Sequence, residues 1–231
     1  MDNGVVASRA QRKPRTRSQD VYIDHKAISA ALRPPTRKAA RAMSPEALRD
    51  HAYKQLTALA QFHSELGHRS HIDFHGPTAR LHTYLRFPSN SGSEYARENG
   101  EKLRVFDLAN VEAAPERRGG FKWFIDILEQ WADSNAVDAV VVESIHNVHL
   151  RDFLVTRGYT ETDHSRRNRE SHERLEEAAE AGELDGRLRF YLAFTKAMSS
   201  MHGTGEYCGT FVRFNPSSCI RLRRDDEIDL L

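Results

Sequence analysis

Alternation of hydrophobic and polar residues predicts strands in the centre of the chain. From Ala79 to Phe87 apolar and polar residues alternate, as on a strand with one buried face. Leu103 to Val111 is apolar on much of both faces, and Val137 to Ile145 is nearly continuously apolar. Both segments are therefore expected in the middle of a sheet. Shorter strands are expected at 159–162, 188–195, 207–214 and 219–222.

Helical spacing of apolar residues predicts helices on both sides of these strands. Ser44-Pro45-Glu46 combines an N-cap, a proline at the first helical position and an early acid, and the helix should run to about Leu66. Another helix should follow Gly120 to about Asp133, and Asn147 should begin a short one ending at Arg157-Gly158. An exposed helix is expected at 170–181. This order predicts an α+β fold with an α/β-type core, whose mixed, mostly antiparallel sheet is flanked by helices.

The composition favours a globular protein without a membrane segment. Hydrophobic residues make up 39% of the chain, enough for one good-sized core. No apolar run approaches the ~20 residues that span a bilayer, and none near the start resembles a secretory signal. Cys208 and Cys219 do not make a disulfide framework. We therefore expect a cytoplasmic protein that is not bound to membranes.

Charge separates the beginning of the chain from the rest. The net charge is +1, but residues 1–43 carry ten basic side chains and three acids. We expect 1–43 to be a basic, largely disordered arm, 44–200 the main domain, and 201–231 a β-rich extension packed on that domain. The arm fits contact with DNA or RNA phosphates, although a solubilising leader or a protein-docking tail fits it equally. Its candidate contacts are Arg9, Arg12, Lys13, Arg15 and Arg17.

A glycine pair between a central strand and a helix predicts an anion site. Gly119-Gly120 allows a tight turn and leaves the first amides of the following helix unpaired, at the positive end of its dipole. Arg117, Arg118 and Lys122 add positive charge beside them. The alternative is a surface turn with solvated basic residues.

The same region resembles the GCN5-related N-acetyltransferase (GNAT) family over about residues 79–162. In that family the glycine loop binds the pyrophosphate of acyl-coenzyme A, and a later segment begins with Asn. Here Asn147, Leu150 and Phe153, followed by Gly158-Tyr159, match the spacing of that later segment. The chain departs from the family at Lys122, where Gly or Ala is usual. It departs again at Leu154, where many members have a tyrosine that protonates the leaving thiolate.

The resemblance implies binding of acetyl-CoA or another acyl-CoA and transfer of its acyl group to a primary amine. The family places the thioester in a gap between the two central strands and polarises its carbonyl with main-chain amides near Val111 and Ala113. Candidate bases are Glu112 and Glu143, and candidate acids are Ser144 and His146. The residues expected to contact the cofactor are Val111, Ala113, Arg117, Arg118, Gly119, Gly120, Phe121, Lys122, Asn147 and Phe153.

Two other functions remain open at this point. His68, His71 and His75, with Asp73 between, are spaced as weak candidates for a metal site in a nucleic-acid modification enzyme. Solvated histidines are the simpler interpretation and a metal cofactor is not expected, although one or two of these histidines are possible acceptor-side bases. A catalytically silent GNAT-like protein that binds nucleic acid or serves in assembly is the other alternative. The expected function is an acyl-CoA-dependent N-acyltransferase, and the basic arm would suit an acceptor associated with nucleic acid.

Overall fold

The computed structural model describes residues 25–62, 69–90, 94–116, 118–145, 147–201 and 208–222. Helices and strands occur in mixed order along the chain. In sequence they are α1 (His25–Leu32), α2 (Arg37–Ala42), α3 (Pro45–Gln61), β1 (Arg69–His75), β2 (Arg80–Ser89), β3 (Tyr95–Arg97), β4 (Val105–Ala114), α5 (Gly120–Ser134), β5 (Ala139–Ile145), α6 (Val148–Thr156), β6 (Thr160–Glu161), α7 (Asp163–Glu180), α8 (Gly186–Met201), β7 (Gly209–Phe214) and β8 (Ile220–Leu222).

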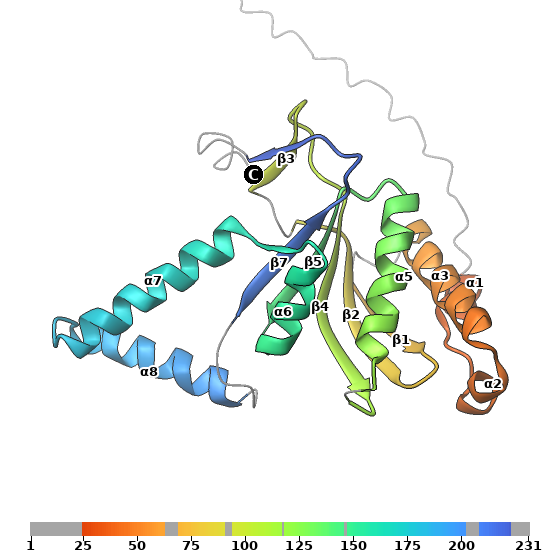
Figure 1. Cartoon of the computed structure of the whole chain (residues 1–231), viewed down its shortest axis with the longest axis horizontal. Helices are drawn as coiled ribbons and strands as arrows, with labels where there is room; N and C mark the ends of the chain where they lie inside the picture. The colour runs from red at the N-terminus through yellow and green to blue at the C-terminus, as the bar shows by residue number, and fades with distance from the viewer. Residues whose placement is uncertain are drawn as a thin grey trace, which may run out of the picture.

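A mixed sheet of six strands forms the centre of the molecule, in the order β1-β2-β4-β5-β7-β6. Among the described strands of this sheet, β4 and β5 are the one parallel pair, and the other neighbours run antiparallel. A parallel pair needs a crossover, which α5 provides (Figure 1). The expected α+β fold with a mixed, mostly antiparallel sheet flanked by helices is confirmed.

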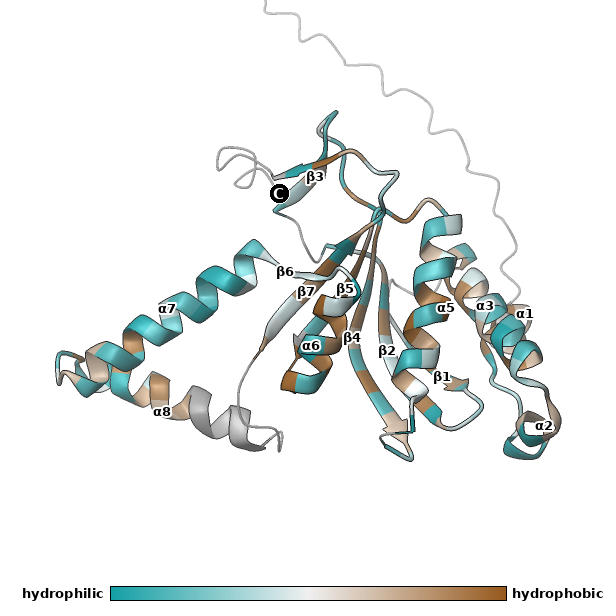
Figure 2. Cartoon of the chain, in the orientation of Figure 1, coloured by the Kyte–Doolittle hydropathy of each residue, from teal (hydrophilic) through white to brown (hydrophobic). Residues whose placement is uncertain are grey.

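Helices α3, α5 and α6 cover one face of the sheet. The buried side of α5 includes Phe124, Leu128 and Trp131, and the indole N–H of Trp131 donates to Thr57 of α3 over 3.0 Å. Apolar residues of these helices form one core with the inward-facing residues of the strands. Hydrophobic and hydrophilic residues accordingly alternate along α5, whereas α7 is almost entirely hydrophilic (Figure 2).

The opposite face of the sheet is divided into an apolar and a polar part. Val105, Val141 and Val212 belong to a second, smaller apolar cluster, against which Tyr95 of β3 and Ile220 of β8 pack. Strands β3 and β8 form a separate two-stranded sheet there. On β1, β2 and the second half of β4 this face carries polar residues, and we call that part the open face.

Asp138, just before β5, holds the small sheet in place. Its carboxylate accepts from the Arg104 main-chain N–H (2.7 Å), from the Arg97 guanidinium (2.9 Å) and from Ser218 Oγ (2.8 Å). Burial raises the pKa of Asp138, but these hydrogen bonds and the charge of Arg97 outweigh it and hold the pKa below its usual value. Asp138 therefore contributes to the fold as a carboxylate.

A helical hairpin, α7 and α8, separates β6 from β7 and extends away from the sheet (Figure 1). The strand expected at 188–195 is wrong, because this segment lies within helix α8. Its aromatic residues suggested a strand, but they have an i,i+4 arrangement in which the rings of Phe190 and Phe194 stack at 6.4 Å. Asp185 accepts from the Leu188 N–H (2.9 Å) and so begins the helix.

The other expected elements are present, with shifted ends. Ser44 caps α3 through a bond from the Ala47 N–H (3.2 Å), but α3 ends at Gln61, and residues 63–68 lie outside the described part. The exposed helix α7 begins at Asp163 rather than near residue 170. Strands β1 and β3 were not expected, and helices α1 and α2 lie within the arm 1–43 that was expected to be largely disordered. Residues 1–24 of that arm lie outside the described residues.

Candidate functional site

Strands β4 and β5 separate at one end of the sheet. Their parallel pairing runs from Val105 with Ala139 to Leu108 with Val142 and then stops, although β4 continues to Ala114 and β5 to Ile145. On its other side β4 stays paired with β2, except that Ala109 has no partner between the pairs Leu85–Leu108 and Tyr84–Asn110. Ala109 is therefore a β-bulge, at the point where the two parallel strands part. Val111 and Ala113 lie beyond it.

The start of α5 lies at this same end of the sheet. Gly119 is its N-cap, in the left-handed conformation (φ 75°) and without a side-chain hydrogen bond. The first helical bond runs from the Trp123 N–H to the Gly119 carbonyl, so Gly120, Phe121 and Lys122 have N–H groups without a partner in the described residues. An uncapped helix start of this kind is able to bind an anion.

The glycine loop is anchored on one side and exposed on the other. Gly120 is buried, and a Cβ there would lie 2.7 Å from the Cβ of Ala79. Thr78 Oγ1 donates to the Arg118 carbonyl over 2.6 Å, which holds the loop against the turn between β1 and β2. A Cβ on Gly119 would meet nothing within 4 Å, and Arg118 is exposed. The loop is thus fixed in position with an accessible outer side.

Lys122 does not block this loop. Its ammonium pairs with Asp126 one turn further along α5, over 2.9 Å, and its side chain is largely exposed. The positive charge remains close to the uncapped amides, while the amides themselves stay uncovered by the lysine.

The two segments of the family resemblance meet in the structure. The rings of Phe121 in α5 and Phe153 in α6 pack edge to face, with centroids 5.9 Å apart. Asn147 caps α6 by accepting from the N–H groups of His149 (2.9 Å) and Leu150 (3.2 Å). Asn147 and Phe153 thereby place α6 beside the glycine loop, and their observed contacts are structural.

Leu154 lies on the inner side of α6 and is fully buried in the main core. A side chain at this position faces the sheet and the other helices. No proton donor for a leaving thiolate is therefore available from residue 154.

The candidate bases Glu112 and Glu143 occupy different environments. Glu112 is exposed on the open face, where the Asn110 amide lies 3.5 Å from its Oε1. Glu143 forms an ion pair with Arg86, which also pairs with the fully buried Asp107. Burial lowers the pKa of Arg86, but the two acids outweigh it and raise the pKa above its usual value. Arg86 is thus a fixed cation, and Glu143 is a less available base than Glu112.

The open face carries polar residues in rows that run across the strands. One row is Asp73, His82 and Glu112, and the next is His71, Tyr84 and Asn110. The His82 Nδ1 lies 2.9 Å from Asp73, and Arg80 binds the other oxygen of that carboxylate at 2.5 Å. His82 and Arg86 were missed as site residues, and Asp73 was considered only together with the metal candidates. The alternation of polar and apolar residues in RSHIDFH, typical of a strand, was the available signal.

The weak metal candidates do not converge. His71 stacks on Tyr84, with ring centroids 4.6 Å apart, and on His82 at 5.6 Å. Stacked rings direct their nitrogens along the ring planes rather than towards a shared point. Within the described part of the chain, no group of three potential ligands is arranged to hold a metal ion. His68 lies outside that part.

Several other predicted residues are also not described. Arg117, His146 and the side chain of Ser144 lie outside the described part, as do Arg9, Arg12, Lys13, Arg15 and Arg17. Their assignments stay predictions.

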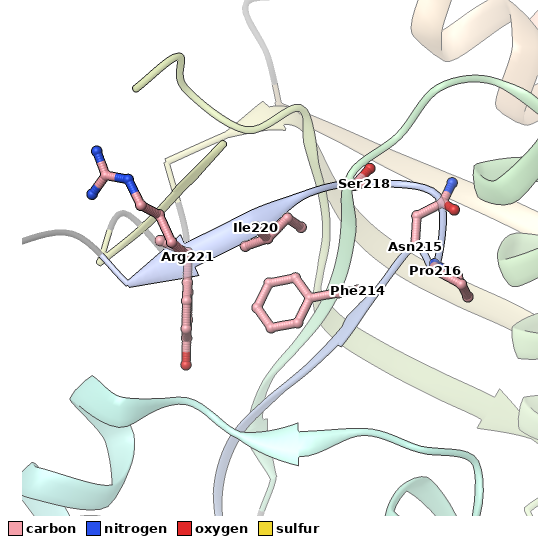
Figure 3. A pocket seen from close by; sticks show the side chains of 7 residues that line it. Phe214, Asn215, Pro216, Ser218, Ile220 and Arg221 are labelled. Atoms are coloured by element: carbon pink, nitrogen blue, oxygen red, sulfur yellow. The ribbon is translucent and has the colours of Figure 1, made fainter. Parts of the chain in front are cut away.

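A pocket of about 390 Å³ lies elsewhere, between β7 and the small sheet (Figure 3). Tyr95, Phe214, Ile220 and Arg221 are among its lining residues, and none of the predicted site residues is. The candidate site at the separation of β4 and β5 is thus defined by the end of the strand pairing and by the uncapped start of α5.

No protein-family model and no curated protein matches this sequence. None of the helices in the described residues has both the length and the apolar character needed to cross a bilayer.

Proposed function

We propose that this protein is an acyl-CoA-dependent N-acyltransferase of the GNAT type, acting on a primary amine. The observation that carries the proposal is the separation of β4 from β5 beside the uncapped start of α5. Ligands of α/β sheets commonly bind where parallel strands end and helices begin. The resemblance predicts this pairing of a gap with a diphosphate site, and the geometry supports it.

Each part of the site has a proposed role. The amides of Gly120, Phe121 and Lys122, with Arg118, bind the diphosphate of the cofactor. Main-chain groups near Val111 and Ala113, which have no partner on the β5 side in the described residues, orient and polarise the thioester carbonyl. When bound, acyl-CoA supplies an activated acyl carbon and a thiolate leaving group.

The reaction requires little help at the sulfur. The amine nitrogen forms a bond to the acyl carbon, the carbon–sulfur bond breaks, and the amine loses a proton. Thiols are far stronger acids than alcohols, the cysteine side chain having a pKa of about 8.5, so the sulfur can leave as a thiolate and take its proton from solvent. This accommodates the buried Leu154, which has no proton to give.

The acceptor is proposed only as a class. A primary amine is what the reaction consumes, and the basic segment Arg9–Arg17 is the reason to include acceptors associated with nucleic acid. That segment lies outside the described residues, so its role rests on sequence alone.

Calorimetry with acetyl-CoA tests the proposal. We expect binding with a micromolar Kd by the unmodified chain and its loss in Gly119→Asp, whose carboxylate repels the diphosphate. Gly119→Asn is the matched control, because Asn has the same shape, carries no charge and tolerates the left-handed conformation. Absence of heat with acetyl-CoA and longer acyl-CoAs overturns the proposal. Salt-sensitive retention on DNA that depends on residues 1–20 would then favour the catalytically silent binding protein.

A further inference from the structure

Asp73 and His82 form a carboxylate–imidazole pair on the open face. They are directly opposed in the ladder of β1 and β2, and the His82 Nδ1 is 2.9 Å from Asp73 Oδ1. Burial raises the pKa of Asp73, but hydrogen bonds from Arg80 and His82 outweigh it and hold the pKa below its usual value. Asp73 is therefore ionised near neutral pH and can only accept hydrogen bonds.

This pairing fixes the tautomer of the imidazole. Because the carboxylate accepts, Nδ1 of His82 must carry the proton, and in the neutral ring Nε2 then has a free lone pair. No hydrogen bond to that nitrogen is present within the described residues. The His82 side chain is 49% exposed, so its free nitrogen is accessible from solvent. An oriented, neutral and accessible imidazole has the properties of a general base.

The position of the pair relates it to the proposed reaction. His82 is directly opposite Glu112 in the ladder of β2 and β4, in the stretch of β4 beyond the Ala109 bulge. Side chains at opposed positions of neighbouring strands lie on the same face, about 5 Å apart at Cβ. Helices α3, α5 and α6 occupy the other face, so the open face is the side from which an amine reaches the gap, past Glu112 on β4 and His82 on the neighbouring strand β2.

We propose that His82 is the general base that takes the proton from the acceptor amine, and that Asp73 is its positioning residue. This inference rests on the proposed acyl transfer. The proton leaves the amine nitrogen for Nε2 of His82 as the nitrogen bonds to the acyl carbon and the sulfur departs as thiolate. The imidazolium that forms is stabilised by the Asp73 carboxylate and later returns its proton to solvent.

Charges around His82 suit an amine that arrives protonated. Asp73 and His71 face it from β1, Arg80 and Tyr84 from β2, and Glu112 from β4. Asp73 is already paired with Arg80 and His82, so Glu112 is the acid of this group that attracts an ammonium ion. The ammonium ion loses one proton to solvent before it attacks, and His82 takes the second proton as the nitrogen bonds to the acyl carbon. A cationic primary amine is therefore the class of acceptor that this face fits.

Acetyl transfer to spermidine, a lysine peptide and an oligonucleotide with an aminoalkyl end tests the assignment. We expect His82→Ala to lower kcat by about 10²- to 10⁴-fold, as loss of a general base does, and added imidazole to restore part of the rate. His82→Ala should also remove the fall in kcat/KM at acidic pH. Asp73→Asn should give a smaller loss, and His164→Gln, at an exposed position of α7 outside the site, should stay close to the unmodified chain.

Calorimetry separates the two proposals. If acetyl-CoA binds to the unmodified chain and to His82→Ala alike, the cofactor site is intact, and transfer can be judged independently. Full transfer by His82→Ala, or loss without imidazole rescue and with an unchanged pH profile, overturns the role of His82 alone. Binding without transfer to any of the amines by the unmodified chain overturns the open face as the acceptor side. No binding of acyl-CoA overturns the proposed function as well.

Discussion

Asp73 and His82 are held together by backbone pairing as well as by their own hydrogen bond. They occupy opposed positions in β1 and β2, so the 2.9 Å contact does not depend on the conformation of a loop. Side chains on strands are positioned more precisely than side chains on loops. The neighbouring helix start is fixed in a similar way, through the close approach of Gly120 to Ala79. Both parts of the candidate site are thus built on β2 and its turn.

The two glycines of the loop should respond differently to alanine. Gly120→Ala brings a Cβ to 2.7 Å from the Cβ of Ala79, so we expect a loss of about 1–3 kcal/mol in the free energy of unfolding. Gly119→Ala meets no atom within 4 Å and should cost only the left-handed conformation, about 1–2 kcal/mol. Urea unfolding measures both. A Gly120→Ala variant as stable as the unmodified chain would contradict the close packing at Gly120.

Introducing at position 154 the tyrosine that many GNAT members have should not improve this protein. Leu154 is fully buried, so Leu154→Tyr overpacks the core and should lower the unfolding free energy by about 1–3 kcal/mol. Leu154→Ala, the matched cavity variant, should lower it by about 2–5 kcal/mol. We expect neither to raise the rate of acetyl transfer. A faster Leu154→Tyr variant would show that this position reaches the thiolate.

Asp138 should make stability depend on acid. Its pKa is lower in the folded state than in the unfolded chain, so its stabilisation is fully present above the unfolded value near 3.8 and is lost as pH falls through the folded value. Asp138→Asn should lower the unfolding free energy by about 1–3 kcal/mol at neutral pH and flatten this dependence. Urea unfolding between about pH 2 and pH 6 measures the unfolding free energy of the unmodified chain and of Asp138→Asn. If the unfolding free energies of both proteins change with pH in the same way, Asp138 is not the source of the acid dependence.

The contact between Phe121 and Phe153 should link α6 to cofactor binding. Phe153→Ala removes the ring that packs on Phe121 at the start of α5. We therefore expect the Kd for acetyl-CoA to rise about 10-fold, which corresponds to a loss of about 1.4 kcal/mol in binding free energy. Phe153→Leu keeps apolar contact and should lose less. Val155→Ala changes an exposed residue of the same helix and serves as the control. An unchanged affinity in Phe153→Ala would separate α6 from the site.

Local signals in the sequence were sufficient for much of the fold. Ser44 and Asn147 begin helices because their side chains cap main-chain N–H groups, a property that is independent of the rest of the chain. Val137 to Ile145 was recognisable because a strand covered on both faces must be apolar throughout. The segment around residue 190 was misjudged because its aromatic residues favour strands, whereas the final structure pairs it with α7 instead of a sheet edge.

The candidate site was only partly predictable for a different reason. Gly119 and Gly120 are recognisable because their backbone role is local. Asp73 and His82 are nine positions apart and become partners only through the register of β1 and β2, and Glu112 joins them from a third strand. The bulge at Ala109 likewise becomes visible only when β4 is aligned with its partner strand β2. Relationships of this kind follow from pairing between strands, which spacing in a single segment does not reveal.

Ala109 is the one residue of β4 that interrupts the regular alternation of its side chains. Before it, Phe106 and Leu108 face the core, and after it Val111 and Ala113 do, although three steps rather than two separate Leu108 from Val111. The bulge therefore takes up one surplus residue, and Glu112 stays on the open face. Deleting Ala109 would preserve this inside–outside pattern and remove the bulge. We then expect β4 to continue its pairing with β5 beyond Leu108. Such a shortened chain would keep its fold but would lack the separation between β4 and β5.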